Sequence, residues 1–374
     1  MTRSQDGSST PGSRYQIAAE VRFRASTTFS GRVTSIDLTI LSASGEGGRG
    51  TVALDLPISP GAVAMYQLRE LVPVTTAQEP QRLRVVARGV DRSGTSFEVA
   101  PLEIALVVEN RSEPDVTVFA AGDIAVCGST STEATARLLD RHSGAVLALG
   151  DNVYPTGTAE QYANCYAPTW GRHRDRTHPT PGNHEYDVGG ALPYFAYFGA
   201  EAGPAGLGYY SFNLGAWHIL SLNSNVPAQP GSAQYEWARN DLLASTSVCT
   251  LAYWHHPVFS SGGNGNNSRM REIWRLLDQV RAEVVLVGHD HHYERFASQQ
   301  ADGIANVEGV REFVVGTGGA ELRAVVSAQP NSQVREDRTW GVLKLTLRST
   351  TYNWDFIPID GQSFHDFGTN ACVP

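Results

Sequence analysis

The sequence predicts a two-domain protein in which an all-β sandwich precedes a larger, layered α/β domain. Up to about residue 112, short apolar segments alternate with polar residues and are separated by turn-forming residues. From Val116 onward, strand-like apolar runs alternate with amphipathic helical patterns, which is typical of an α/β domain with parallel strand pairing. A chain of 374 residues is long enough for two such domains.

The first domain is predicted over residues 15–112, after a polar and flexible segment at residues 1–14. Six strand-like segments follow one another there, at 15–23, 33–41, 50–58, 64–71, 81–90 and 102–110. Their number and spacing predict a sandwich of immunoglobulin or fibronectin type III character. The domain contains no histidine and no cysteine, so we expect a packing or attachment module.

The second domain is predicted over residues 113–374, because a polar stretch with a proline at 110–115 marks the boundary. Its expected strands are the apolar runs at 116–123, 145–152, 217–225, 249–257, 283–294 and 312–319. Helical spacing predicts helices over 131–142, 233–245 and 268–280.

Charge and hydropathy exclude some classes of protein. The formal net charge is -9, which argues against a role in coating nucleic acid or binding a membrane surface, because both need a basic face. No apolar run reaches 18 residues, so no membrane span is expected. A small anionic substrate remains compatible with this charge, because bound cations reverse the field inside a cleft.

Polar clusters follow the buried strands of the second domain. In chain order these clusters contain Asp123, Asp151 with Tyr154, Asn183 with His184, His255 with His256, and His289 with His291. One such cluster alone is more often a turn or a helix cap. Five clusters at strand ends, where open α/β sheets bind their ligands, indicate a common site.

The residue types in these clusters indicate metal chemistry. Carboxylate, amide, phenol and imidazole groups together suit Fe, Zn or Mn, and there are enough of them for two ions. A carboxylate such as Asp151 can bridge two cations that lie about 3.5–4 Å apart and clamp a phosphate ester. The predicted reaction is therefore hydrolysis of a small-molecule phosphate ester.

The order "GD…LGDNVY…GNHE…WHHP…GHDHHYER" resembles the calcineurin-like metallophosphoesterases, and within them the purple acid phosphatases and their bacterial relatives. Most of that superfamily has an Asp-x-His pair, whereas the position two after Asp123 is Ala125. Tyr154, three residues after Asp151, resembles the tyrosine of the purple branch. The resemblance covers residues 116–320 and implies a four-layer αββα sandwich, and the preceding β-sandwich resembles the domain that precedes the plant enzymes.

The resemblance implies a binuclear centre and assigns its ligands. An Fe(III) ion would be held by the first set, and an Fe(II), Zn or Mn ion by the second. The first set is Asp123, Asp151, Tyr154 and His291, and the second is Asp151, Asn183, His255 and His289. His255 is chosen over His256 because Pro257 completes the family's His-x-Pro pattern.

The resemblance also implies a mechanism in which a metal-bound hydroxide attacks phosphorus and His184 protonates the leaving oxygen. Plant purple enzymes have further substrate-contacting histidines after His-x-Pro, whereas here that stretch contains none. It includes the Gly- and Asn-rich run 262–267, which is predicted to be a flexible loop near the cleft. His256 and His292 are candidate replacements that would bind substrate.

Three functions remain open. A phosphomonoesterase of purple acid phosphatase type is the preferred interpretation. A phosphodiesterase or nucleotide hydrolase on the same fold stays open, because it would use the same ligands and differ in cleft shape, which the sequence does not give. A non-catalytic binding protein is disfavoured because all seven expected ligands are present. The natural substrate and the oligomeric state do not follow from the sequence.

Cys127, Cys165, Cys249 and Cys372 form no CxxC pair. They could be free buried thiols or two disulfides with three possible pairings, and the resemblance favours disulfides and a secreted or periplasmic protein. The written start of the chain, MTRSQDGSST, has no apolar segment of the kind found in signal peptides.

Overall fold

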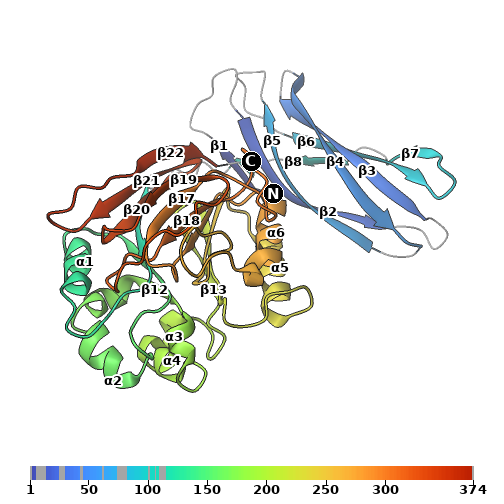
Figure 1. Cartoon of the computed structure of the whole chain (residues 1–374). Coiled ribbons are helices and arrows are strands. Elements are labelled where there is room, and N and C mark those ends of the chain that lie inside the picture. The colour runs from blue at the N-terminus through green and yellow to red at the C-terminus, as the bar shows by residue number, and fades with distance from the viewer. Residues whose placement is uncertain are drawn as a thin grey trace. The chain divides into compact units, whose positions relative to one another are not determined.

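The computed structural model describes residues 115–372 and, before them, residues 2–5, 14–24, 30–42, 45–60, 63–73, 82–99, 102–105 and 107–108. The chain divides into two compact units, Met1–Ser112 and Glu113–Val373 (Figure 1). Each unit is described by itself below.

The first unit consists of strands and turns in its described residues. Its strands are β1 (Thr2–Gln5), β2 (Arg14–Arg24), β3 (Gly31–Ser42), β4 (Gly45–Ile58), β5 (Val63–Pro73), β6 (Arg82–Asp91), β7 (Ser96–Glu98), β8 (Leu102–Ala105) and β9 (Val107–Val108). One sheet has the order β5-β2-β1-β9, and the other has the order β4-β3-β6-β7 with β8 also paired to β6. Strand β1 lies in the segment predicted to be flexible, and residues 6–13 of that segment lie outside the described residues.

The second unit contains a six-stranded mixed sheet. Its strands are β10 (Val116–Ala121), β11 (Ala145–Leu149), β12 (Thr177–Thr180), β20 (Gly341–Leu347), β21 (Thr351–Pro358) and β22 (Phe367–Ala371). Their order is β12-β11-β10-β20-β21-β22. The pairs β10–β11 and β11–β12 are parallel, and the pairs from β10 through β20 and β21 to β22 are antiparallel.

A seven-stranded mixed sheet completes this unit. Its strands are β13 (Tyr210–Leu214), β14 (Trp217–Ser221), β15 (Cys249–Tyr253), β16 (Val284–Val287), β17 (Tyr293–Phe296), β18 (Arg311–Val315) and β19 (Ser332–Glu336). Their order is β13-β14-β15-β16-β18-β17-β19, with parallel pairing from β14 through β15 and β16 to β18.

Helices lie on both outer sides of the two sheets. Helix α1 (Thr130–Asp140) lies on one side, and α5 (Ala233–Ala244) and α6 (Arg271–Gln279) lie on the other (Figure 1). The shorter helices are α2 (Ala159–Gln161), η1 (Tyr162–Tyr166), η2 (Trp170–Arg176), α3 (Asn183–Tyr186), α4 (Leu192–Phe198), η3 (Gly199–Ala202) and η4 (Ser268–Met270).

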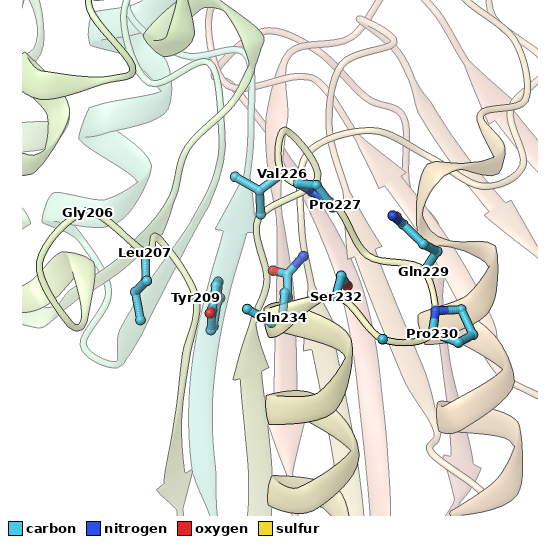
Figure 2. Close-up of a pocket in the computed structure, with 11 residues that line it drawn as sticks. Gly206, Leu207, Tyr209, Val226, Pro227, Gln229, Pro230, Ser232 and Gln234 are labelled. Atoms are coloured by element: carbon cyan, nitrogen blue, oxygen red, sulfur yellow. The ribbon is translucent and has the colours of Figure 1, made fainter.

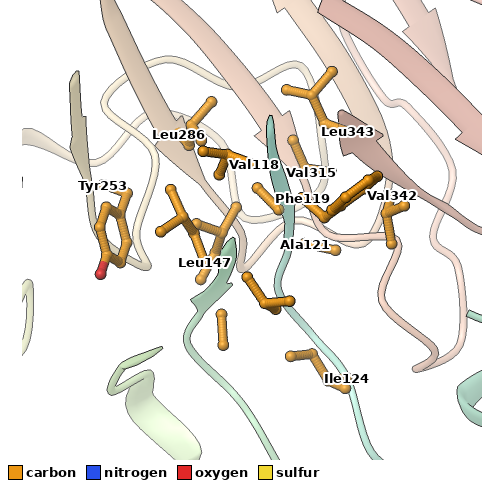
Figure 3. Close-up of a cluster of buried hydrophobic side chains, with 14 of the residues drawn as sticks. Val118, Phe119, Ala121, Ile124, Leu147, Tyr253, Leu286, Val315, Val342 and Leu343 are labelled. Carbon is orange, nitrogen blue, oxygen red and sulfur yellow. The ribbon is translucent and has the colours of Figure 1, made fainter. Parts of the chain in front are cut away.

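Two apolar cores hold these layers together. The larger core contains buried side chains from both sheets, such as Val118 and Leu147 from one and Leu286 from the other (Figure 3). The second core joins the seven-stranded sheet to α5 and α6 through residues such as Ala252 and Trp274. Burial on both faces explains why these strands are continuous apolar runs.

The structure confirms the α/β class and the three long helices, but the sheets are mixed, so the prediction of parallel pairing holds only for the central strands. The sequence did not predict β12, β13, β19, β20, β21 or β22 as strands. Among the open pairings, the structure forms Cys127–Cys165 and Cys249–Cys372. Within the described residues, no helix is long and apolar enough to cross a membrane.

Candidate metal centre

The polar clusters predicted at strand ends come together where the two sheets face each other. Asp123 and Asp151 follow β10 and β11, which are neighbours in the six-stranded sheet. His255 and His289 follow β15 and β16, which are neighbours in the seven-stranded sheet. Because parallel strands end at the same edge of a sheet, each sheet presents its polar residues on one side.

The Asp123 carboxylate joins three candidate ligands. Its Oδ1 accepts a hydrogen bond from the Tyr154 hydroxyl at 2.8 Å and lies 3.3 Å from His291 Nε2. Its Oδ2 accepts from the backbone N–H of His289 at 2.8 Å. The side chain of Asp123 is completely buried, so these contacts exclude water from it.

Two glycines make room for this carboxylate. A Cβ atom at Gly288 would lie 2.7 Å from Asp123 Oδ2, and one at Gly316 would lie 2.8 Å from the same atom. Any larger residue at either position would displace the carboxylate. This explains why glycine directly precedes His289.

The Asp151 carboxylate contacts both halves of the cluster. Its Oδ2 lies 3.1 Å from the Tyr154 hydroxyl, which donates to it, and 3.2 Å from His255 Nε2. Its Oδ1 accepts from the backbone N–H of His184 at 2.9 Å. His255 Nε2 also lies 3.1 Å from Asn183 Oδ1. Asp151 therefore occupies the middle of the cluster, as a bridging group must.

Two imidazoles are fixed so that Nε2 points into the cluster. His255 Nδ1 donates to the carbonyl of Leu149 at 2.9 Å, and His291 Nδ1 donates to the carbonyl of Glu321 at 2.6 Å. Since a carbonyl only accepts, each Nδ1 carries a hydrogen, and in the neutral ring Nε2 has a free lone pair. This is the arrangement that metal-binding histidines use.

The backbone is strained at three of the candidate ligands. Asp123, Asp151 and His289 have φ values of 58°, 48° and 70°. These values lie in the left-handed region, which residues other than glycine rarely adopt. Such strain costs roughly 1–3 kcal/mol at each residue and collects at functional sites. The fold therefore holds these three residues in place against a local preference.

The ionisable groups of the cluster shift one another's pKa values. Burial raises the pKa of Asp123, but the imidazoles of His291 and His255 outweigh burial, and the pKa lies below its usual value. Burial lowers the pKa of His255, but Asp151 outweighs burial and raises it to about 9. Burial and the two carboxylates raise the pKa of Tyr154 well above its usual value. These carboxylates therefore share protons with the histidine and tyrosine side chains beside them.

His289 and His256 lie beside this cluster. The ring centroid of His289 is 5.0 Å from that of His255 and 4.4 Å from that of His256. One ligand atom each from Asp151, His255 and His289 lie within 4.8 Å of one another. Burial lowers the pKa of His289 to about 4, so this ring stays neutral at pH 7. His256 Nδ1 is 2.8 Å from Ser224 Oγ, which fixes its ring.

His184 lies at the entrance of the cluster. Its Nδ1 donates to the carbonyl of Pro155 at 2.5 Å, and its Nε2 lies 3.7 Å from Asp151 Oδ2. Its side chain is 29% exposed, whereas that of Asp151 is buried, so His184 can reach a ligand from the solvent side. Its ring packs against Tyr154 with centroids 4.6 Å apart.

His292 is not brought to the cluster. Its side chain is completely buried, and its Nε2 lies 3.1 Å from Glu294 Oε2. No contact of its ring with the candidate ligands is found in the described part of the chain. The expectation that His292 binds substrate therefore has no support in its position, and its contact with Glu294 is structural.

The sequence did not reveal the role of Glu185. This buried carboxylate accepts from the backbone N–H groups of Asn152 and Gly182, at 2.9 and 2.6 Å, and from the Tyr162 hydroxyl at 3.2 Å. It ties the loop of Asp151 to the loop of Asn183. Burial, and then the charge of Asp151, raise the pKa of Glu185 to about 7. A hint of this role in the sequence is that Glu185 directly follows Asn183 and His184.

The donor set fits metal ions. Two carboxylates, one amide oxygen, one phenol and three imidazoles converge, and bonds to backbone carbonyls orient two of the rings. Five of the seven side chains are buried, and Asn183 and His289 are half-buried. Hydrogen bonds link Tyr154, Asp123, Asp151 and the rings at distances of 2.8–3.3 Å, where cations would replace the shared protons. No thiol contributes, which favours Fe, Zn or Mn.

A separate open pocket of about 530 Å³ lies between residues 206–209 and 226–234 (Figure 2). Apolar groups such as Leu207, Val226 and Pro230 form much of its wall. None of the candidate ligands lines it, so this pocket is distinct from the metal-ligand cluster. The side chain of Asn223 donates to the carbonyl of Leu207 in the pocket wall, and that of Asn225 donates to the carbonyl of Pro181.

Comparisons with known proteins agree with this architecture. The chain is 29% identical over 224 residues to a probable purple acid phosphatase of Arabidopsis thaliana, covering 52% of each chain. It is 28% identical over 201 residues to an uncharacterized protein of Mycobacterium tuberculosis, covering 42% of this chain and 38% of the relative. The chain thus spans about half the length, or less, of these curated relatives.

The solved structure of a purple acid phosphatase from yellow lupin seeds has a similar fold. The TM-score is 0.59 at 16% identity, and the match covers 98% of this chain and 73% of the lupin chain. At this identity the match concerns the fold alone.

A family model described as calcineurin-like phosphoesterase matches residues 104–293, about half of the chain. The matched residues include Asp123, Asp151, Asn183, His255 and His291. The family implies a dinuclear metal centre. This chain therefore belongs to the calcineurin-like phosphoesterase family.

Proposed function

We propose that this protein hydrolyses phosphate monoesters at a dinuclear metal centre of purple acid phosphatase type. The observation that carries the proposal is the position of Asp151 Oδ2, 3.1 Å from the Tyr154 hydroxyl and 3.2 Å from His255 Nε2. One carboxylate oxygen between a phenol and an imidazole is suited to bridge two cations.

The proposed ligands fall into two sets that share Asp151. Contacts among Asp123, Tyr154 and His291 support the first set, and the contact of His255 with Asn183 supports the second. His289 joins the second set because its ring lies beside His255. We propose Fe(III) for the first set, since a phenolate favours that ion, and Fe(II), Zn or Mn for the second.

Bound cations would supply Lewis acidity, which polarises the phosphate oxygens and lowers the pKa of a coordinated water. The chain's own residues do the rest. Asp123 and Asp151 are buried and ionised, which fixes negative charge where cations bind. Their burial also keeps bulk water out of the cluster.

His184 is proposed as the proton donor to the leaving oxygen. Its Nδ1–H is used by the carbonyl of Pro155, so its Nε2 carries a proton only in the imidazolium form. Asp151 Oδ2 lies 3.7 Å from that Nε2. Nε2 is then the atom from which His184 would deliver a proton to the leaving oxygen.

The test compares a chromogenic phosphomonoester with the matching phosphodiester, on protein of known iron, zinc and manganese content. Faster monoester cleavage supports the proposal. Faster diester cleavage favours the alternative, a phosphodiesterase or nucleotide hydrolase that uses the same ligands. A metal-loaded protein that cleaves neither favours a non-catalytic binding protein.

The accessory features of the protein are also proposals. Two disulfides favour secretion or a periplasmic location, because such bonds persist in oxidising compartments. The first unit, with its two sheets, is proposed as an immunoglobulin- or fibronectin-like attachment domain.

A further inference from the structure

Residues 258–267, directly after Pro257, form a wall beside the candidate ligands. Hydrogen bonds hold this segment in place. Buried Glu312 accepts hydrogen bonds from the backbone N–H groups of Val258 and Phe259, both at 3.0 Å. Buried Asp290 accepts from the N–H of Asn264 at 3.0 Å. Asp290 therefore holds the Gly- and Asn-rich run that the sequence suggests to be flexible, and Glu312 holds the residues just before it.

A second segment, residues 320–329, continues this wall. Its Ala320 N–H donates to the carbonyl of Asp123, and its Arg323 N–H donates to the carbonyl of His291, both at 2.9 Å. Ser261 joins the two segments, because its carbonyl accepts from the N–H of Val326 at 2.9 Å. Hydrogen bonds thus join the two segments to each other and join the second segment to Asp123 and His291.

Arginines on this wall or next to it lack the partners that other arginines have. Most arginines of residues 115–372 contact a carboxylate or carbonyl, as Arg172 does with Glu133. For Arg269, Arg271 and Arg323 no such side-chain partner is found within the described residues. Arg269 in η4 and Arg271 at the start of α6 follow the first segment, and Arg323 lies on the second. Arg271 differs from the other two because its Nε is buried, whereas Arg269 and Arg323 are exposed.

Both exposed arginines lie near the cluster. Asn267 N–H donates to the carbonyl of Pro257, directly after His256, and Asn267 Oδ1 accepts from the N–H of Arg269 at 3.1 Å. Arg323 is bonded through its backbone to His291 itself.

We propose that Arg269 and Arg323 bind a second anionic group of the substrate, beyond the phosphate that is cleaved. The preferred substrates are then phosphate esters whose leaving group carries a carboxylate or a further phosphate. This inference rests on the proposed function.

Three physical arguments support a second anion. Guanidinium groups form strong, directional hydrogen bonds with carboxylates and phosphates. The protein has a net charge of -9, so an anionic leaving group would be repelled unless local positive charge offsets the field. In the described chain no ion pair joins Arg323 to Glu321, the acidic residue of its own segment, so its charge is available to a ligand.

The test uses the full-length, metal-loaded protein and two probes of nearly equal size, glycerol 3-phosphate and 3-phosphoglycerate. They differ mainly in one carboxylate. We expect kcat/KM to be about tenfold higher for 3-phosphoglycerate, mainly through a lower KM, since one charge-assisted contact gives a factor of this order. The preference should shrink as salt is raised, because the arginines are exposed.

The variants Arg269→Gln and Arg323→Gln should each lose most of this preference while glycerol 3-phosphate is cleaved as before. Arg137→Gln is the matched control, because Arg137 is an exposed arginine on α1 paired with Glu133. Circular dichroism and metal content show whether the variants remain folded and loaded.

Each outcome decides between the possibilities. A preference that both arginine variants abolish supports the inference. Equal cleavage of the two probes by the native protein overturns it, and so does an equal loss on both probes in the variants, because the arginines would then serve the cleaved phosphate. If neither these probes nor the chromogenic monoester is cleaved, the proposed function itself fails.

Discussion

The two sheets of the second unit contribute different chemistry to the same site. The six-stranded sheet presents oxygen donors on the loops after its parallel strands, Asp123, Asp151 and Asn183. The seven-stranded sheet presents imidazoles, His255 and His289, after β15 and β16. Neither sheet alone holds a complete ligand set, so the site depends on how the sheets stack.

The two halves are also held in place differently. The oxygen half depends on strained backbone at Asp123 and Asp151 and on the buried carboxylate of Glu185, which accepts N–H bonds from two of its loops. The imidazole half depends on backbone carbonyls that bind the Nδ1 atoms of His255 and His291. Perturbing the oxygen half should therefore damage charge and geometry together.

The largest effect is expected at the residue that contacts both halves. Asp151→Asn removes one negative charge from the middle of the cluster and should lower metal content to below half and kcat by at least about a hundredfold. Metal analysis and steady-state kinetics measure this. Asp360→Asn, at an exposed carboxylate, is the control. A fully metallated and active Asp151→Asn protein would contradict the bridging role.

A smaller effect is expected at the phenol of the oxygen half. If Tyr154 binds Fe(III), the native protein is pink to purple through phenolate-to-iron charge transfer, and Tyr154→Phe loses the colour. Tyr166→Phe is a matched control, because the Tyr166 hydroxyl is buried without a partner among the described residues. An absorption spectrum decides the point: a colourless native protein with full iron would refute the assignment.

Much of this site was predictable because its signals are local. Each ligand-bearing strand is a short apolar run that ends in a polar cluster, and Asp151 with Tyr154 or Asn183 with His184 lie close together in the sequence. The apolar runs also predicted the layered sheets, because strands covered on both faces have no polar side.

Features that depend on distant contacts could not be predicted. Glu312 anchors Val258 across 54 residues, and Glu294 anchors Ser261 across 33, so neither looks like more than an ordinary acidic residue in the sequence. The disulfide pairing was equally open. His292 is adjacent to His291 in the sequence but lies buried against Glu294, and the sequence does not reveal this difference in position.

Glu185→Gln should loosen the oxygen half without removing a ligand. Loss of a charged acceptor for two buried N–H groups should cost about 1–3 kcal/mol of unfolding free energy and weaken metal binding. Denaturant unfolding and metal titration measure these two effects. The hydrogen bonds of the imidazole half should stay intact. Unchanged stability and metal affinity of the variant would show that Glu185 does not hold these loops.

The smallest effect is expected from pH in the metal-free protein. His255 has a pKa of about 9 in the folded state, above the value near 6.5 of an unfolded chain, so the folded state binds more protons between these values. The stability that His255 contributes is complete below about pH 6.5 and is lost as pH rises through about 9. Unfolding by denaturant after chelation should show this decline, and metal-loaded protein should not. A flat profile of the metal-free protein would contradict the Asp151–His255 contact.

The central claim is that the two halves form one dinuclear centre, and the most direct measurement is the number of metal ions bound per folded chain. We expect two ions in the native protein, and fewer than one ion per chain when Asp151 is replaced by Asn. A native protein that cleaves phosphate esters while binding one ion or none, under conditions where iron, zinc and manganese are all supplied, would contradict the claim.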